Sequence, residues 1–228
     1  MDLSTLKGTQ DYLPEDQILR TRIVRVLTAA FERYGFSPCE TPILHHFEVL
    51  SSKYSGGAEI LKETYSLRDQ GDRHLGLRYD LTVPFSRLVG KQERALPLPF
   101  KRYEIGRVFR NGPVKTGRLR EFTQCDVDVV GSHSMISDAE LVAMAFEVFD
   151  ELELRSVCEI NSRKLLSGII EAVGVPHGLV GTVILSVDKL KKIGAEGVYA
   201  ELAEKGVAQD LAERLTRYCE VIEARLAE

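Results

Sequence analysis

The segment from Phe100 to Gly131 constrains the fold of this chain more than any other segment does. Apolar and polar residues alternate from Tyr103 to Arg110 and again from Glu121 to Val130, and the residues between these runs are rich in Gly, Pro, Lys and Arg. Alternation with a period of two indicates strands, because successive side chains of a strand point to opposite faces of the sheet. The segment is therefore predicted to form two antiparallel strands joined by a long basic loop.

The second strand of this hairpin has one apolar face and one polar face. The polar face carries Phe122, Gln124, Asp126 and Asp128. An aromatic ring, an amide and two carboxylates on one face are unsuited to an ordinary core, because buried polar groups need partners. This face is predicted to contact a ligand.

The loop and its flanks supply cationic side chains, namely Lys115, Arg118 and Arg120, with Arg110 at the end of the first strand. Guanidinium groups bind phosphate oxygens in forked, charge-assisted pairs, so this set suits a polyphosphate. The neighbouring carboxylates attract a cation such as an ammonium or an imidazolium. The hairpin is predicted to hold a nucleotide at one end and an amine at the other. The alternative is a solvated hairpin whose charges only keep a sheet edge soluble.

The chain resembles the histidyl-tRNA synthetases in two stretches, REFTQCDVDVVG and LRYDLTVPF, and its hairpin resembles the second signature motif of class II aminoacyl-tRNA synthetases. Two earlier stretches, KGTQDYLPED and YGFSPCETPIL, resemble the family's opening segment and the first class II motif. The resemblance implies an α+β fold, in which an antiparallel sheet of the class II type with flanking helices precedes a mostly helical inserted subdomain. The implied domains are a catalytic core over residues 1–155, and part of the sheet edge plus the helical insertion over residues 156–228.

The same resemblance implies a histidine–tRNA ligase. Such an enzyme uses ATP to convert histidine to histidyl-adenylate and then transfers the histidyl group to tRNA(His). Mg²⁺ would arrive with ATP, and the protein would be a homodimer. Two alternatives stay open: a synthetase-like regulatory subunit of ATP phosphoribosyltransferase in histidine biosynthesis, and a non-catalytic histidine-binding paralogue.

For the nucleotide, the resemblance implies Arg110 as the catalytic residue, which grips the α-phosphate and stabilises the charge that develops as histidine attacks ATP. Phe122 matches the residue that stacks on adenine, although the sequence pattern without this match favours a core aromatic. Arg118 and Arg120 match residues that reach the outer phosphates or steady the loop.

For histidine, the resemblance implies a set of four residues: Asp80, Thr82, Gln124 and Asp128. The first three would face the α-amino group, and Asp128 would face the imidazole. An Asp just before a helix is also a common N-cap, so the residue pattern alone leaves both roles open for Asp80. Pro42 in the first motif would lie at the dimer interface.

The chain departs from the family at two places. An acidic residue that helps to hold adenine usually stands two positions after the motif arginine, and here that position is Gly112. The third class II motif and the anticodon-binding domain have no counterpart in residues 1–228. We therefore expect these residues alone to be an incomplete, inactive catalytic domain.

Composition limits the other possibilities. The net charge is −4, from 30 Lys and Arg against 34 Asp and Glu, so no overall positive field indicates nucleic-acid binding. The four cysteines form no CxxC pair, and the five histidines lack the spacing of metal ligands, so no protein-bound metal is predicted. No apolar run is long enough to span a bilayer and no leader is evident, so the cytoplasm is the expected compartment and no membrane partner is expected.

Several further elements are predicted outside the hairpin. Helical spacing predicts a helix from Pro14 to Tyr34, and Ser137 with Glu140 forms a capping-box pattern for a helix that ends near Leu152. A closing strand is predicted over residues 153–160. Beyond it, helices are predicted over residues 165–173, 189–192 and 207–226.

Overall fold

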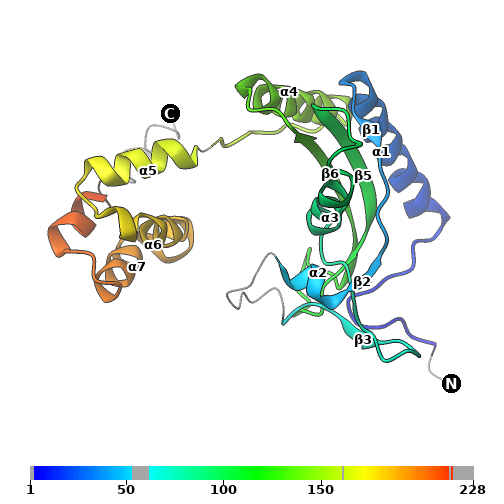
Figure 1. Ribbon diagram of the computed structural model, residues 1–228, viewed down its shortest axis with the longest axis horizontal. Coiled ribbons are helices and arrows are strands. Elements are labelled where there is room, and N and C mark those ends of the chain that lie inside the picture. Colours follow the sequence, from blue (N-terminus) through cyan, green and yellow to red (C-terminus); the bar gives the residue numbers. More distant parts are fainter. Residues whose placement is uncertain (1–2, 53–61, 161, 216, 218–228) are drawn as a thin grey trace. The chain divides into compact units, whose positions relative to one another are not determined.

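The computed structural model describes residues 3–52, 62–160, 162–215 and 217. The chain divides into two compact units, Met1–Val157 and Cys158–Glu228. The first unit combines two sheets with helices, and the second is helical in its described residues (Figure 1). The α+β class predicted from the sequence is confirmed.

Helix α1 (Pro14–Arg33) starts the first unit. Its proline stands at the first turn, where a missing N–H costs no helical hydrogen bond. Acidic residues in the first turn and Arg33 in the last turn complement the helix dipole. The chain leaves the helix through Gly35, whose φ of 77° suits glycine. The predicted helix is confirmed to within one residue.

The main sheet contains the predicted hairpin. Strands β5 (Phe100–Phe109) and β6 (Glu121–Val130) pair antiparallel along their whole length, and β1 (Ser37–Pro38) adds in parallel to β5. The strand order is β1-β5-β6. The hairpin is confirmed, with the first strand beginning three residues earlier than the alternation predicted.

A second, antiparallel sheet has the order β2-β4-β3. Its strands are β2 (Leu44–His46), β3 (Ser66–Arg68) and β4 (His74–Leu77). Two helices accompany it, α2 (Phe47–Ser51) and α3 (Thr82–Gln92). Leu50, Tyr79 and Val83 form a small buried cluster that joins these helices to the segment after β4.

Helices α1 and α4 (Met135–Glu151) cover one face of the main sheet (Figure 1). The core between them is built on the buried residues Phe31, Phe36, Tyr103 and Met144. Because Tyr103 stands at an odd position of β5, the even-numbered residues of β5 and β6 point to the opposite face. That opposite face is the one that carries the predicted site.

The N-terminus of α4 differs from the prediction. Ser134, not Ser137, is the N-cap residue, and its hydroxyl accepts a hydrogen bond from the N–H of Ile136. Ser137 lies inside the helix and donates to the hydroxyl of Ser132, while the Glu140 carboxylate binds the ammonium of Lys101 at 2.8 Å. The capping-box prediction was wrong, because the helix begins three residues earlier, where Ser134 caps it.

The predicted closing strand over residues 153–160 was also wrong. These described residues follow α4 without strand pairing. Leu154, Val157 and Ile160 are mostly exposed, with Val157 91% exposed. The apolar residues of this segment therefore do not form a buried strand face.

Three helices surround the core of the second unit: α5 (Arg163–Ala172), α6 (His177–Val187) and α7 (Leu190–Glu204). Helix α5 was predicted, α7 was predicted only over its first residues, and α6 was missed. Its segment is rich in β-branched residues, which favour helix weakly, but Val180, Val183 and Ile184 lie on one buried stripe. Of the helix predicted over 207–226, residues 209–215 are helical, and most of the remainder lies outside the described residues.

Glu201 of α7 lies between two ammonium groups. Its Oε1 is 2.7 Å from Nζ of Lys189, and it also pairs with Lys205. Hydrogen bonds from these two lysines lower the pKa of the Glu201 carboxyl from 4.5 to about 2. Protonation therefore removes an interaction that the folded state has and the unfolded chain lacks.

We expect the Glu201 interaction to be intact above pH 4.5 and to be lost as pH falls toward 2, because its folded pKa is depressed. An NMR titration of the side-chain carboxyl carbons should give one Glu that titrates well below the others. That signal should be absent in Glu201→Gln, whose thermal stability should also change less than that of the wild type over this pH range. A Glu201 resonance that titrates near 4.5 would contradict the interaction.

Candidate active site

The polar side chains of β5 and β6 lie together on the face opposite α1 and α4. Directly opposed residues of an antiparallel pair share a face. The opposed pairs on this face are Arg102 with Asp128, Glu104 with Asp126, Gly106 with Gln124, and Val108 with Phe122. Charged groups therefore lie at one end of this face, and an aromatic ring lies at the other end.

Arg110 and Phe122 meet at the loop end of this face. The guanidinium carbon of Arg110 is 5.0 Å from the centre of the Phe122 ring, and its Nε donates to the carbonyl oxygen of Tyr79 at 3.1 Å. A cation over an aromatic face at this separation is mutually stabilising. The structure therefore places the predicted phosphate-binding and base-stacking side chains side by side.

Gln124 and Asp126 form the middle of the face. The amide nitrogen of Gln124 donates to both Asp126 oxygens, at 2.9 and 3.2 Å. The amide oxygen of Gln124 is buried and has no hydrogen-bond partner in the described part of the chain. A buried acceptor without a partner is costly, so this oxygen is suited to a ligand that donates a hydrogen bond.

Asp128 stands at the charged end and pairs with Arg102. The distance from Nη2 of Arg102 to Oδ2 of Asp128 is 2.6 Å, and the Arg102 side chain is fully buried. The guanidinium also lies 4.1 Å from the centre of the Phe85 ring. Burial raises the pKa of the Asp128 carboxyl above its ordinary value, and the Arg102 charge opposes that shift. Arg102 thus holds the predicted imidazole-binding carboxylate in one position.

Glu104 is the centre of a buried charge network. Its Oε1 accepts from Nη1 of Arg78 at 2.7 Å and from the backbone N–H of Thr41 at 3.0 Å, and its Oε2 lies 3.3 Å from Nη1 of Arg102. The side chains of Arg78, Arg102 and Glu104 are all at most 4% exposed. Two buried cations are therefore balanced by Glu104 together with Asp128.

Gly106 makes room for this network. A Cβ at Gly106 would overlap Nη2 of Arg78. Arg78 crosses the β5 backbone here, because its Nε donates to the carbonyl oxygen of Arg107 at 2.8 Å. The glycine in the middle of a strand is thus explained by close approach of a buried guanidinium, as strand glycines often are.

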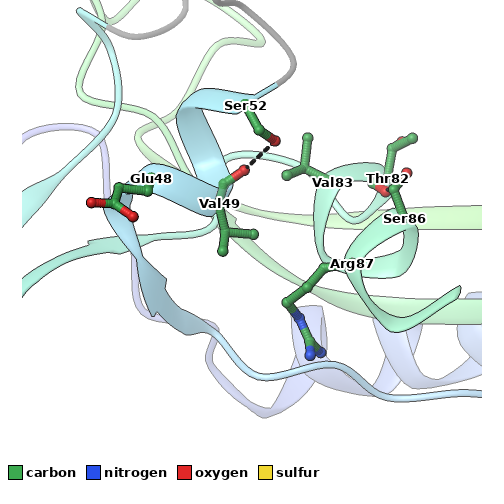
Figure 2. A pocket seen from close by; sticks show the side chains of 7 residues that line it. All are labelled: Glu48, Val49, Ser52, Thr82, Val83, Ser86 and Arg87. Atoms are coloured by element: carbon green, nitrogen blue, oxygen red, sulfur yellow. Dashed lines mark hydrogen bonds between the residues drawn. The ribbon is translucent and has the colours of Figure 1, made fainter. Parts of the chain in front are cut away.

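Asp80 and Thr82 stand where α3 begins. The Asp80 carboxylate accepts from the backbone N–H of Val83 at 3.0 Å, so it caps the helix. Thr82 lines a hollow of about 660 Å³ between α2 and α3 (Figure 2). The other lining residues are Glu48, Val49, Ser52, Val83, Ser86 and Arg87. Thr82 is the one predicted site residue among them, so this hollow is distinct from the polar sheet face.

The two loop arginines have protein partners. Arg118 binds both carboxylate oxygens of Glu63, at 2.6 and 2.7 Å. The Nε of Arg120 is 3.4 Å from the carbonyl oxygen of Gly112, and its backbone N–H donates to Gly8. The loop is thus tied to a segment that precedes β3 and to the N-terminal segment.

Pro42 lies on the surface of the first unit, and its carbonyl oxygen is 2.7 Å from Nε2 of His45. The next residues, Ile43 and Leu44, are 42% and 46% exposed. Two exposed branched aliphatic side chains beside Pro42 are compatible with an interface at this place.

The described residues contain no group of three or more His, Cys, Asp or Glu side chains that could hold a metal ion. Within the same residues no single helix is long and apolar enough to span a membrane. One bent pair of helices, α5 with α6, has the length and composition of a span, on those two criteria alone.

The comparisons with known proteins decide the family. The family model described as histidyl-tRNA synthetase matches residues 8–226. The chain belongs to the histidyl-tRNA synthetase family. It is 54% identical over 215 residues to histidine–tRNA ligase 1 of Bacillus cereus, which covers 94% of this chain and 50% of that protein. It is 41% identical over 226 residues to the histidine–tRNA ligase of Wolinella succinogenes, covering 98% of this chain and 50% of that protein.

Solved structures agree with this family. The crystal structure of histidyl-tRNA synthetase from Nostoc sp. PCC 7120 matches with a TM-score of 0.81 at 30% identity, over 96% of this chain and 48% of that one. An ATP phosphoribosyltransferase regulatory subunit/histidyl-tRNA synthetase from Bacillus halodurans C matches with a TM-score of 0.77 at 21% identity, over 95% of this chain and 55% of that one, which shows the shared fold. The class II fold is thus confirmed for this member of the family. The chain spans about half the length of the relatives it matches.

Of the predicted site residues in this synthetase-family chain, those on the hairpin share one face, whereas Arg118 and Arg120 are tied to other segments. Sequence reasoning missed Arg78, Arg102 and Glu104, which form the buried charge network next to Asp128. One signal was available in the sequence: Arg102, Glu104 and Gly106 share the strand face that carries Gln124 and Asp128. A buried face with this composition requires charge partners.

Proposed function

We propose that this chain supplies the histidine and ATP contacts of a histidine–tRNA ligase, which forms histidyl-adenylate and passes the histidyl group to tRNA(His). The observation that carries the proposal is the buried, unpartnered amide oxygen of Gln124, which lies on the same face as the Arg110–Phe122 pair and Asp128. One face then offers a cation, an aromatic ring, an acceptor and a carboxylate.

Each of these groups has a role in the proposed reaction. The Phe122 ring stacks on adenine, and the guanidinium of Arg110 stabilises negative charge on the α-phosphate as the histidine carboxylate attacks it. Gln124 accepts from the α-ammonium group, and Asp80 and Thr82 at the start of α3 are proposed to contact the same group. Asp128 accepts from an imidazole N–H. No residue forms a covalent intermediate, because the substrate carboxylate is the nucleophile.

Asp128 also bears on the choice of amino acid. A partly buried carboxylate held by Arg102 accepts one more N–H from a ring, and an apolar analogue would leave that acceptor without a partner. This contact supports histidine over amino acids of similar size that lack a ring donor.

We further propose that Mg²⁺ enters with ATP, bound mainly by phosphate oxygens. The protein would act in the cytoplasm as a homodimer with Pro42 at the subunit interface. The high identity to histidine–tRNA ligases supports the ligase over the regulatory-subunit alternative.

The test is histidine-dependent exchange of labelled pyrophosphate into ATP by the full-length natural protein. We expect exchange that requires histidine, and little exchange from residues 1–228 alone, because the relatives are about twice as long. A full-length protein that binds histidine without exchange would overturn the ligase proposal in favour of a regulatory or paralogous role.

A further inference from the structure

We infer that Glu63 is a base-specificity residue that accepts the exocyclic amine of adenine. The inference rests on the proposed function, because it requires ATP on the polar sheet face. It starts from the space around Gly112. A Cβ at this buried glycine would lie 2.7 Å from the carboxyl carbon of Glu63, and 2.8 and 2.9 Å from its two oxygens. The Glu63 carboxylate therefore fills the volume that a side chain at position 112 would occupy.

Hydrogen bonds hold both the side chain and the backbone of Glu63. Its oxygens bind Nη2 of Arg118 at 2.6 and 2.7 Å, and the backbone oxygen of Glu63 accepts from the N–H of Asn111 at 2.6 Å. The Glu63 side chain is 19% exposed, against 47% for Arg118. Glu63 is thus held against the start of the loop, rather than free in solvent.

This place is close to the proposed base site. Gly112 follows two residues after Arg110, whose guanidinium lies over the Phe122 ring. For Glu63 to select the base, a base stacked on Phe122 has to present its edge toward the start of the loop. The carboxylate of Glu63 lies beside Gly112, although Glu63 is far from the hairpin in the sequence.

The chemistry of the carboxylate predicts which base it selects. An ionised carboxylate has about four lone-pair sites and no donor, so after binding Arg118 it still accepts from another N–H. Adenine presents an amine at its six position, whereas hypoxanthine and guanine present a carbonyl oxygen there. A carboxylate attracts the amine and repels the carbonyl oxygen. Glu63 therefore favours ATP over a 6-oxo nucleotide.

The test compares ATP with inosine triphosphate, which carries a carbonyl oxygen in place of the amine. Binding to the full-length protein is measured by calorimetry in the presence of Mg²⁺. We expect the wild type to bind ATP about 10- to 100-fold more tightly, as for one hydrogen bond to a charged group. In Glu63→Gln, Arg118 donates to the amide oxygen and leaves the NH₂ group toward the base. The preference for ATP should then fall about tenfold or more, with inosine triphosphate binding retained or improved.

Glu63→Ala is the second variant. It should lower ATP binding toward that of inosine triphosphate and leave inosine triphosphate binding no weaker, which a merely structural loss would not do. ATP preference that survives in both variants overturns the role of Glu63 while leaving the proposed function intact. A wild-type protein that binds neither nucleotide overturns both.

Discussion

Replacing Arg110 by alanine is expected to lower histidine-dependent pyrophosphate exchange by about 100- to 1,000-fold, as removal of one preorganised transition-state donor does in other enzymes. The reason is positional. The guanidinium is held over the Phe122 ring and against the carbonyl oxygen of Tyr79, so its charge is already in place before the phosphate charge develops. The loss should appear in kcat more than in the KM for histidine.

Arg107→Ala is the matched control for this change. Arg107 lies on β5, three residues before Arg110, and its side chain points to the opposite face, where it is 64% exposed and paired to Glu121 at the surface. It should keep exchange within about twofold of the wild type, since surface ion pairs contribute little. If Arg110→Ala retains nearly full exchange, or if the two variants lose activity equally, Arg110 has no special role in the reaction.

The second large effect is expected for Glu104→Gln, which should lower the free energy of unfolding by about 3–5 kcal/mol. Glu104 is 2% exposed and is the partner of two buried guanidinium groups, those of Arg78 and Arg102. The amide keeps the shape of the side chain but removes its charge. Arg78 is then left as a buried cation with only neutral acceptors, and Arg102 keeps Asp128 as its charged partner.

Urea denaturation followed by circular dichroism measures this effect, with Glu121→Gln as the control. Glu121 also pairs with an arginine, but its partner Arg107 is exposed to solvent, so its loss should cost less than about 1 kcal/mol. Similar stabilities for Glu104→Gln and the wild type would show that the buried network does not depend on the Glu104 charge. Glu104→Gln should also weaken histidine binding. Glu104 holds Arg102 in place, and Arg102 in turn orients Asp128.

The hairpin was predictable because its signals are local. Alternation along β5 and β6 follows from the pleat, and the basic residues between the strands mark the loop. The same local signals failed where a neighbouring residue competed, as Ser134 did with Ser137 at the start of α4. They failed again at α6, where burial of a stripe outweighed weak helix propensity. The first failure is a competition between two nearby caps, and only the second was decided by contacts outside the local pattern.

The candidate site shows the same division. The residues on the polar face were predictable, because residues two apart in a strand share a face. The partners of Glu104 and of the loop residue Arg118 were not, because Arg78 and Glu63 come from segments outside the hairpin. Gly112 illustrates this. The sequence shows only that a glycine stands where the family usually has an acidic residue. In the fold, the carboxylate of Glu63 fills the space that a side chain at this position would occupy.

The amino-acid order thus determined the hairpin, the side chains that share its polar face and, through several stretches of the chain, the synthetase family. Only the folded chain decided which charges neutralise one another on that face and which carboxylate lies beside Gly112. The physical reason is the range of the interactions. Strand alternation acts between adjacent residues, whereas burial of a charge requires a partner, and that partner comes from whichever segment the packing brings within about 3 Å.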